Sequence, residues 1–151
     1  MNQSLENQVM REITPLSDKD CFYIGERIKT EFTYPIHHHD EYELNFIEQA
    51  AGVRRVIGDS TEVINDFDLV LITGRDLEHV WEQNECSSKR IHEITIHFSS
   101  QLFNESLLNK NQLESIHKMF EKAKNGLSFP MPAIMKVYSH LCSLSSEQGF
   151  Y

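Results

Sequence analysis

Short segments in which apolar and polar residues alternate occupy most of the chain before residue 98. They are rich in β-branched and aromatic residues, which favour the pleated surface of a sheet. The pattern predicts strands at residues 21–28, 42–47, 54–57, 62–64, 68–72, 79–82 and 90–98. Because these segments follow one another closely with no helical pattern between them, they predict an antiparallel sandwich or barrel.

The spacing of apolar residues changes after residue 98 and becomes that of two helices. The first helix is predicted from the stripe Leu113, Ile116, Phe120 and Ala123. The second helix follows Pro132, which suits a first helical turn, and its stripe is Ile134, Val137, Leu141 and Leu144. This later stripe suits either packing against the strands or contact with a second subunit.

The chain has 151 residues, a length that favours one domain of about 100–200 residues. No apolar run approaches the roughly 20 residues needed to cross a bilayer. The first residues also lack the basic and apolar segments of a secretory signal. We therefore expect a cytoplasmic protein without a membrane partner.

Net charge is −9, from 14 Lys and Arg residues against 23 Asp and Glu residues. Nucleic-acid binding needs clustered basic side chains, and the densest basic points here are two isolated pairs. We expect that this segment alone does not bind DNA or RNA. The cysteines, Cys21, Cys86 and Cys142, are far apart and odd in number, which argues against a disulfide framework and against a cysteine zinc site.

One histidine-rich segment carries the densest candidate chemistry. His37 and His39 lie two residues apart, so on a strand their side chains point to one face. Glu43 keeps that parity, and His79 in a later strand is the candidate for a fourth group. Imidazoles with a carboxylate suit a divalent ion such as zinc, iron, manganese or nickel. The alternatives are a polar lining that contacts an organic ligand, or a solvated loop after Pro35.

Neighbouring positions extend this candidate site. Asn45 shares the parity of Glu43, and Trp81 shares that of His79, so Trp81 suits either stacking on a ligand or core packing. The expected ligand-binding residues are His37, His39, Glu43, Asn45, His79 and Trp81. The candidate metal ligands are His37, His39, Glu43 and His79. His38 is left out, because it points away from its two neighbours.

The last predicted strand has two different faces. Ile94 and Ile96 share one parity, whereas Glu93, Thr95 and His97 share the other. Because the apolar set is expected to form the core, His97 is predicted to lie at the surface or at an interface and not to act as a ligand.

Two motifs resemble those of the cupin family. His37-x-His39-x3-Glu43, with Gly52 after it, resembles the first cupin motif, and the stretch ending in Gly74-x4-His79 resembles the second. The resemblance spans about residues 20–98. It implies a mostly β fold with C-terminal helices, in which a cupin-like antiparallel β-barrel (double-stranded β-helix) is followed by two α-helices. It also implies a pocket in the mouth of the barrel.

The order of elements resembles the N-terminal effector-binding domain of AraC-family transcription regulators. In that family a cupin barrel and a helical pair precede a C-terminal domain of two helix-turn-helix units. The resemblance implies an N-terminal arm at residues 1–19, a cupin β-barrel at 20–98 and a helical segment at 99–151 for dimerisation or linkage. DNA would be a partner only through a C-terminal helix-turn-helix domain that is absent from this chain.

The resemblance implies a ligand-sensing and dimerisation domain that binds a small-molecule effector, with a sugar as one candidate, and forms homodimers. We expect no enzymatic activity, because the chain has neither a Gly-x-Ser-x-Gly elbow nor a Gly-rich phosphate loop. The main alternative is a metal-dependent cupin enzyme, such as a dioxygenase or isomerase. A plain carbohydrate-binding or dimerisation barrel is the third hypothesis. A divalent metal is the one cofactor that the residues suggest.

Overall fold

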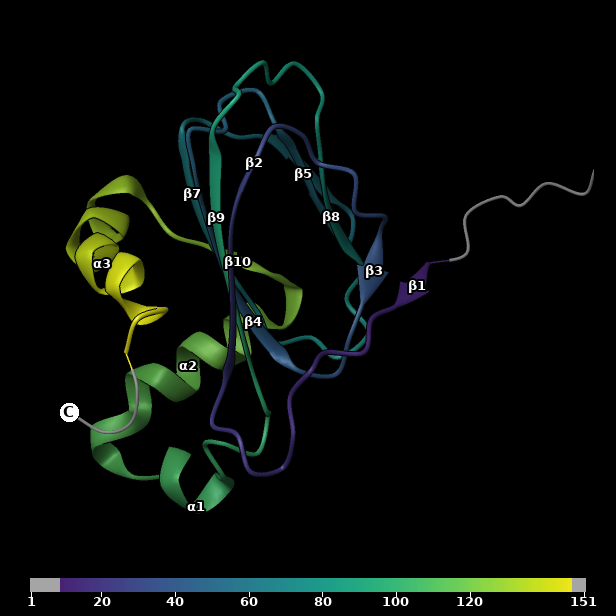
Figure 1. The fold of residues 1–151 in the computed structure, drawn as a ribbon. Helices are drawn as coiled ribbons and strands as arrows, with labels where there is room; N and C mark the ends of the chain where they lie inside the picture. Colours follow the sequence, from purple (N-terminus) through teal and green to yellow (C-terminus); the bar gives the residue numbers. More distant parts are fainter. Residues whose placement is uncertain (1–8, 148–151) are drawn as a thin grey trace, which may run out of the picture.

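The computed structural model describes residues 9–147, so the first eight residues of the expected arm lie outside the described part. Two five-stranded sheets face each other, and the helices pack on the outer surface of one of them (Figure 1). The protein is therefore mostly β with C-terminal helices, as the sequence predicts.

The sheet that carries the helices has the strand order β10-β7-β4-β9-β2. Its strands are β10 (Leu127–Ser128), β7 (Phe67–Ile72), β4 (Tyr42–Glu48), β9 (Ile91–Phe98) and β2 (Tyr23–Lys29). Every neighbouring pair in this sheet is antiparallel. β4 lies at its centre, and its register places Glu43 beside His97 of β9 and Ile72 of β7.

The second sheet has the order β1-β3-β8-β5-β6. Its strands are β1 (Met10–Arg11), β3 (His37–His38), β8 (His79–Glu82), β5 (Arg54–Ile57) and β6 (Ser60–Val63). β1 pairs with β3 in parallel, so part of the segment expected to be an arm belongs to this sheet. The sequence pattern did not indicate β1, β3 or β10, because each has only two residues.

The closed barrel expected from the cupin resemblance is not formed. Within residues 9–147 no strand of one sheet pairs with a strand of the other. The edges are β1 and β6 in one sheet and β10 and β2 in the other, and none of them pairs across to the facing sheet. The two sheets consequently form a sandwich with an interior between them.

The helical segment contains three α-helices where two were expected: α1 (Glu105–Leu108), α2 (Glu114–Lys122) and α3 (Met131–Leu144). The missed helix α1 is a single turn, too short to show an apolar period. Its N-cap is Asn104, whose side chain accepts a hydrogen bond from the Leu107 backbone N–H. Pro132 lies in the first turn of α3, as predicted. No helix among the described residues is long and apolar enough to span a membrane.

Side chains of β4 alternate between the two surfaces of its sheet. Leu44 and Phe46 point outward, where they pack beneath α2 and α3. Ile47 points into the sandwich and belongs to its apolar core with Trp81 and Ile91. Glu43 and Asn45 have the same inward parity as Ile47, so one strand carries both an apolar outer face and a partly polar inner face.

Phe46 joins the sheet to α3, and its removal tests this packing. Phe46 is fully buried and makes edge contacts with Tyr138 of α3. Phe46→Ala is expected to lower the free energy of unfolding by about 3–5 kcal/mol, because it leaves a cavity under the helix. Val63→Ala on edge strand β6, where the side chain is exposed, is the control and should change it by less than about 1 kcal/mol. Urea unfolding measures both; equal effects would contradict this account of the core.

Candidate functional site

A cavity of about 160 Å³ lies between the two sheets. Its lining residues are Glu12, Arg27, Lys29, Phe32, Tyr34, His37, Glu43, Asn45, Trp81, Glu93, Thr95 and His97. Most of these side chains are polar, and many are buried. Burying polar groups is unfavourable unless partners satisfy them, so a polar interior of this kind marks a candidate binding site and not ordinary core packing.

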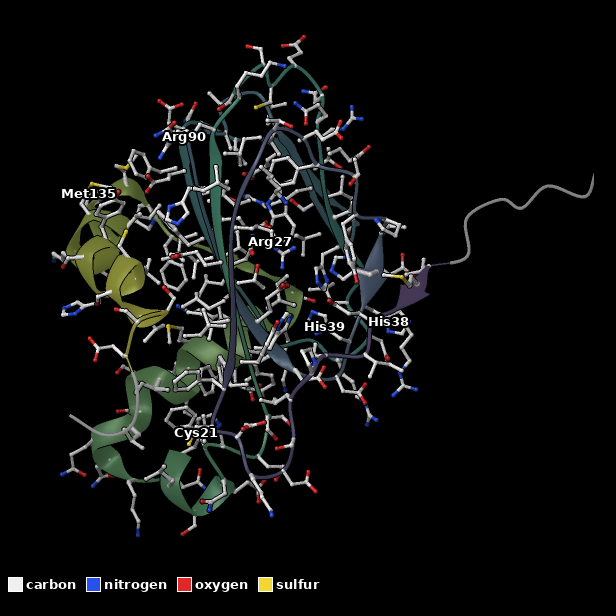
Figure 2. All side chains as sticks on the ribbon, viewed as in Figure 1. Cys21, Arg27, His38, His39, Arg90 and Met135 are labelled. Atoms are coloured by element: carbon white, nitrogen blue, oxygen red, sulfur yellow. The ribbon has the colours of Figure 1, made fainter. Side chains whose placement is uncertain are left out.

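Three histidines, His37, His39 and His79, converge beside this cavity, and of these His37 lines it. His37 of β3 lies opposite His79 of β8 in the ladder, and His39 follows β3. All three are buried. Figure 2 shows His39 on the inner side and His38 further out, toward β1. The structure therefore brings together the three histidines that the sequence selected and leaves His38 outside their cluster.

Each of these imidazoles is oriented by a hydrogen bond to the backbone. Nδ1 of His37, His39 and His79 lies 2.8, 2.9 and 2.8 Å from the carbonyl oxygens of Pro35, Glu41 and Leu77, respectively. A carbonyl oxygen only accepts, so Nδ1 is the donor in each ring. In the neutral ring, Nε2 then carries the lone pair.

The Nε2 atoms face one another inside the cluster. His79 Nε2 lies 3.2 Å from His39 Nε2 and 3.0 Å from Glu43 Oε2. Two nitrogen lone pairs at this distance repel each other unless a cation lies between them. The cation is either a proton on one ring or a metal ion bound by both rings.

Glu43 supplies a buried negative charge to the same point. Its carboxylate also lies 3.6 Å from His39 Nε2 and 3.4 Å from His97 Nε2. Burial alone would raise the pKa of Glu43, but the charge of His79 and the hydrogen bonds from the imidazoles outweigh it and hold the pKa well below its usual value. The carboxylate is therefore ionised and attracts a cation.

The same carboxylate affects the histidines unequally. Burial would lower the pKa of His39, but the hydrogen bond and charge of Glu43 outweigh burial and raise it. For His37, burial and the charge of His79 dominate and lower the pKa. The cluster thus holds one imidazole that favours its charged form and one that favours its neutral form.

His97 was predicted at the surface or an interface, and this prediction was wrong. His97 is 5% exposed and lines the cavity. β9 is covered on both surfaces, by α3 on the side of Ile94 and Ile96 and by the opposite sheet on the side of His97. The sequence correctly placed His97 on the face of β9 opposite Ile94 and Ile96. Both faces of β9 are buried, however, and alternation along a strand does not show that its polar face is buried as well.

Glu12 is a second site residue that the sequence did not reveal. It follows β1, and its Oε2 lies 3.7 Å from His37 Nε2 and 3.9 Å from His39 Nε2. It reaches the cluster only because β1 pairs with β3. Glu12, His39 and His97 form a second group whose candidate ligand atoms lie within 4.8 Å of one another. No local signal at Glu12 could have indicated this.

Asn45 and Trp81 both line the cavity, as their parity predicts. Asn45 accepts a hydrogen bond of 2.7 Å from the Thr95 hydroxyl. Trp81 also packs in the apolar core, and its Nε1 donates to Asp68 at 3.5 Å. Trp81 therefore packs in the core and also borders the cavity, and stacking on a ligand stays a prediction.

Two cationic side chains, Lys29 and Arg27, line the cavity together with its carboxylates. Lys29 Nζ lies 2.9 Å from Glu93 Oε1, which neutralises that buried carboxylate. Arg27 also lines the cavity, and it has no ion pair among residues 9–147. A guanidinium in this position provides several hydrogen-bond donors for an oxygen-rich ligand.

The donor set fits a divalent metal ion. His37, His39 and His79 place one candidate ligand atom each within 4.8 Å of the others. Glu43 adds an ionised oxygen beside two of them. Backbone hydrogen bonds at Nδ1 are the support that metal-bound imidazoles usually have. Nitrogen ligands with one carboxylate suit zinc, iron, nickel and manganese.

Comparison with known proteins shows a shared fold at low sequence identity. No protein-family model matches the sequence, and no curated protein matches it. An apo variant of ToxT from Vibrio cholerae superposes with a TM-score of 0.52 at 12% identity, over 89% of this chain and 51% of that one. ToxT bound to (E)-4-(8-methylnaphthalen-1-yl)but-3-enoic acid gives a TM-score of 0.50 at 12% identity, over 87% and 51%. The chain thus shares its fold with about half of the length of ToxT.

Proposed function

We propose that this chain is the ligand-sensing domain of an AraC-type transcription regulator and that its effector binds in the cavity between the sheets. One observation carries the proposal: a buried, polar cavity with converging imidazoles lies inside a fold shared with ToxT, itself an AraC-family regulator. A ToxT structure with a bound organic acid supports small-molecule binding within this fold class. The proposal extends to homodimers and to DNA contact through a further helix-turn-helix domain.

The cavity favours a small polar effector. Its volume of about 160 Å³ is below the roughly 300–1,000 Å³ of pockets that hold drug-sized molecules. Its wall offers hydrogen-bond donors from Arg27 and acceptors from Asn45 and Glu93. A sugar or another compact molecule with several oxygen atoms matches this chemistry.

We further propose that His37, His39, His79 and Glu43 hold a divalent metal ion. When bound, the metal would supply the positive charge that the facing Nε2 atoms require and a Lewis-acid contact for an effector oxygen. The chain's own residues orient the imidazoles through their backbone hydrogen bonds and keep the carboxylate ionised.

Metal binding is tested by replacing neighbouring histidines with opposite orientations. The wild-type chain, stripped with chelator, is expected to bind one equivalent of Zn²⁺ or Ni²⁺ in calorimetry. His39→Ala should weaken binding by at least about 100-fold, because it removes a ligand. His38→Ala is the matched control and should leave the affinity unchanged. Equal losses in the two variants, or a wild type that binds no metal, would refute the metal proposal.

The N-terminal segment connects to the site through Glu12, which suits a moving arm. A ligand shifts an equilibrium between arm positions only by its different affinity for each. Glu12→Gln removes a negative charge near His37 and His39 and is expected to weaken Zn²⁺ binding by roughly tenfold. Arg11→Gln, whose side chain pairs with exposed Asp40, is the control. Deleting residues 1–15 should weaken binding at least as much as Glu12→Gln; unchanged affinity in both would remove the arm from the mechanism.

The regulator proposal is tested by the gene and by a ligand screen. The reading frame is expected to continue beyond codon 151 into a basic domain of two helix-turn-helix units. A thermal-shift screen of sugars and small metabolites should then find an effector, since a ligand of the native state raises Tm by about 2–4 °C per kcal/mol for a chain of this size. A reading frame that stops at Tyr151 would refute the regulator proposal.

The buried three-histidine, one-carboxylate cluster also favours a second candidate function, a metal-dependent enzyme. The two candidates differ in turnover. A regulator domain loaded with metal binds its effector and releases it unchanged, whereas an enzyme converts it. Mass spectrometry of the screened ligand after incubation with the Fe²⁺- or Mn²⁺-loaded chain distinguishes them, and catalytic conversion would favour the enzyme.

A further inference from the structure

His97 differs from the other three imidazoles of the interior, because neither of its ring nitrogens has a hydrogen-bond partner among residues 9–147. The residue is 5% exposed. Its Nε2 lies 3.4 Å from Glu43 Oε1, without the geometry of a hydrogen bond. An unpaired polar group in a protein interior costs about 1–3 kcal/mol and calls for an explanation, such as a bound ion. The orphaned nitrogens of His97 therefore point to a further ligand.

A second group of metal-ligating atoms includes His97. Glu12, His39 and His97 offer one ligand atom each, and these atoms lie within 4.8 Å of one another. His39 also belongs to the group with His37 and His79, and the single lone pair of its Nε2 binds one ion. When the ion of that first group takes His39, Glu12 and His97 are left for a second ion.

Glu43 offers an oxygen atom to each group. Its Oε2 lies 3.0 Å from His79 Nε2 and 3.6 Å from His39 Nε2. Its other oxygen, Oε1, is the one that faces His97. Ions in two-metal sites lie about 3.5–4 Å apart, a separation that one carboxylate spans with its two oxygens. Glu43 is therefore placed to bridge two ions.

The second group borders the cavity more fully than the first. Glu12, Glu43 and His97 all line the cavity. His39 and His79 do not line it. An ion held by the second group would consequently lie next to the space in which a ligand binds.

The charges around the second group set its relative affinity. Glu12 and Glu43 provide two carboxylates, which favour a divalent cation. Arg27 and Lys29 line the same cavity and oppose it, although Lys29 is paired with Glu93. With one imidazole instead of three, and with another cation nearby, the second group is expected to bind its ion more weakly than the first.

We propose that Glu12, Glu43 and His97 hold a second divalent cation beside the cavity, and that Glu43 bridges it to the ion of the three-histidine cluster. Two carboxylates with one imidazole suit manganese, iron or zinc. The inference rests on the metal site of the proposed function and adds a separate position to it.

Mn²⁺ is the probe, because electron paramagnetic resonance distinguishes its free and bound forms and reports a second Mn²⁺ nearby. The complete chain is loaded with one equivalent of Zn²⁺ and is then titrated with Mn²⁺. One Mn²⁺ per chain is expected to bind, at least about tenfold more weakly than the Zn²⁺. A chain loaded with two equivalents of Mn²⁺ alone should give the spectrum of an exchange-coupled pair, since a shared carboxylate couples the two ions.

Two histidines on opposite faces of β9 provide the matched variants. His97→Ala should weaken Mn²⁺ binding to the Zn²⁺-loaded chain by at least about tenfold and remove the exchange coupling, while the first Zn²⁺ equivalent still binds. His92→Ala is the control, because His92 lies near Glu26 on the outer face, and it should preserve both ions. Glu12→Gln, at a partly exposed side chain, should also weaken Mn²⁺ binding, so the test does not depend on the folding of His97→Ala.

The outcomes separate this inference from the site on which it rests. A wild type that binds no metal would refute both. Binding of one Zn²⁺ without any Mn²⁺ would overturn the second position alone, as would two bound Mn²⁺ ions without exchange coupling. Equal Mn²⁺ affinities of His97→Ala and His92→Ala would also overturn it. Loss of the first Zn²⁺ in His97→Ala, to the same extent as in His39→Ala, would assign His97 to the first site instead.

Discussion

The interior of this protein depends on one electrostatic requirement: a buried carboxylate and several imidazole nitrogens need positive charge between them. Glu43 is 3% exposed, and His39 and His79 are each 1% exposed, so bulk water does not screen these groups from one another. The backbone hydrogen bonds at Nδ1 fix which nitrogen of each ring faces the cluster. A cation at this point is therefore favourable, and it would lie between groups that come from both sheets.

The central strand β4 explains how one small domain holds two cavities of opposite character. Alternation along the strand directs Glu43 and Asn45 inward and Leu44 outward. The inward residues border a small polar cavity, and Leu44 lies on the floor of a larger apolar cleft between the sheet and the helices α2 and α3. β9 repeats the division, with Thr95 and His97 inside and Ile96 outside. A sheet covered on both sides thus borders a polar cavity on one face and an apolar cleft on the other.

Much of the strand pattern could be predicted from the sequence, because the alternation of apolar and polar residues is a local signal. All seven predicted strands are present, and no end is displaced by more than two residues. That the sheets do not close into a barrel could not be predicted, because pairing between their edges joins strands far apart in the sequence. The same limit applies to α1, whose four residues make a single turn and cannot show a repeating apolar position.

Within the site, the sequence predicted residues that lie close together along the chain and missed those that lie far from them. His37, His39 and Glu43 share a short segment, so the sequence selects them together, but β3 ends at His38 and Glu43 lies in β4 of the facing sheet. They meet across the interior of the sandwich and not, as the sequence predicted, through parity along one unbroken strand. His97 and Glu12 enter the same cluster from β9 and from the segment after β1, through pairings that no local pattern encodes. His97 also shows that parity assigns residues to two faces but does not say which face is exposed when a strand is covered on both.

The parallel pairing of β1 with β3 has a consequence for the behaviour of the chain in concentrated solution. Without β1, the sheet order would end at β3, and the backbone N–H and C=O groups of its outer edge would be unpaired. An unpaired edge is a template for strand addition from another molecule. The N-terminal segment therefore also covers the edge of β3. A chain that lacks this segment would expose an unpaired edge strand and is expected to associate with other copies.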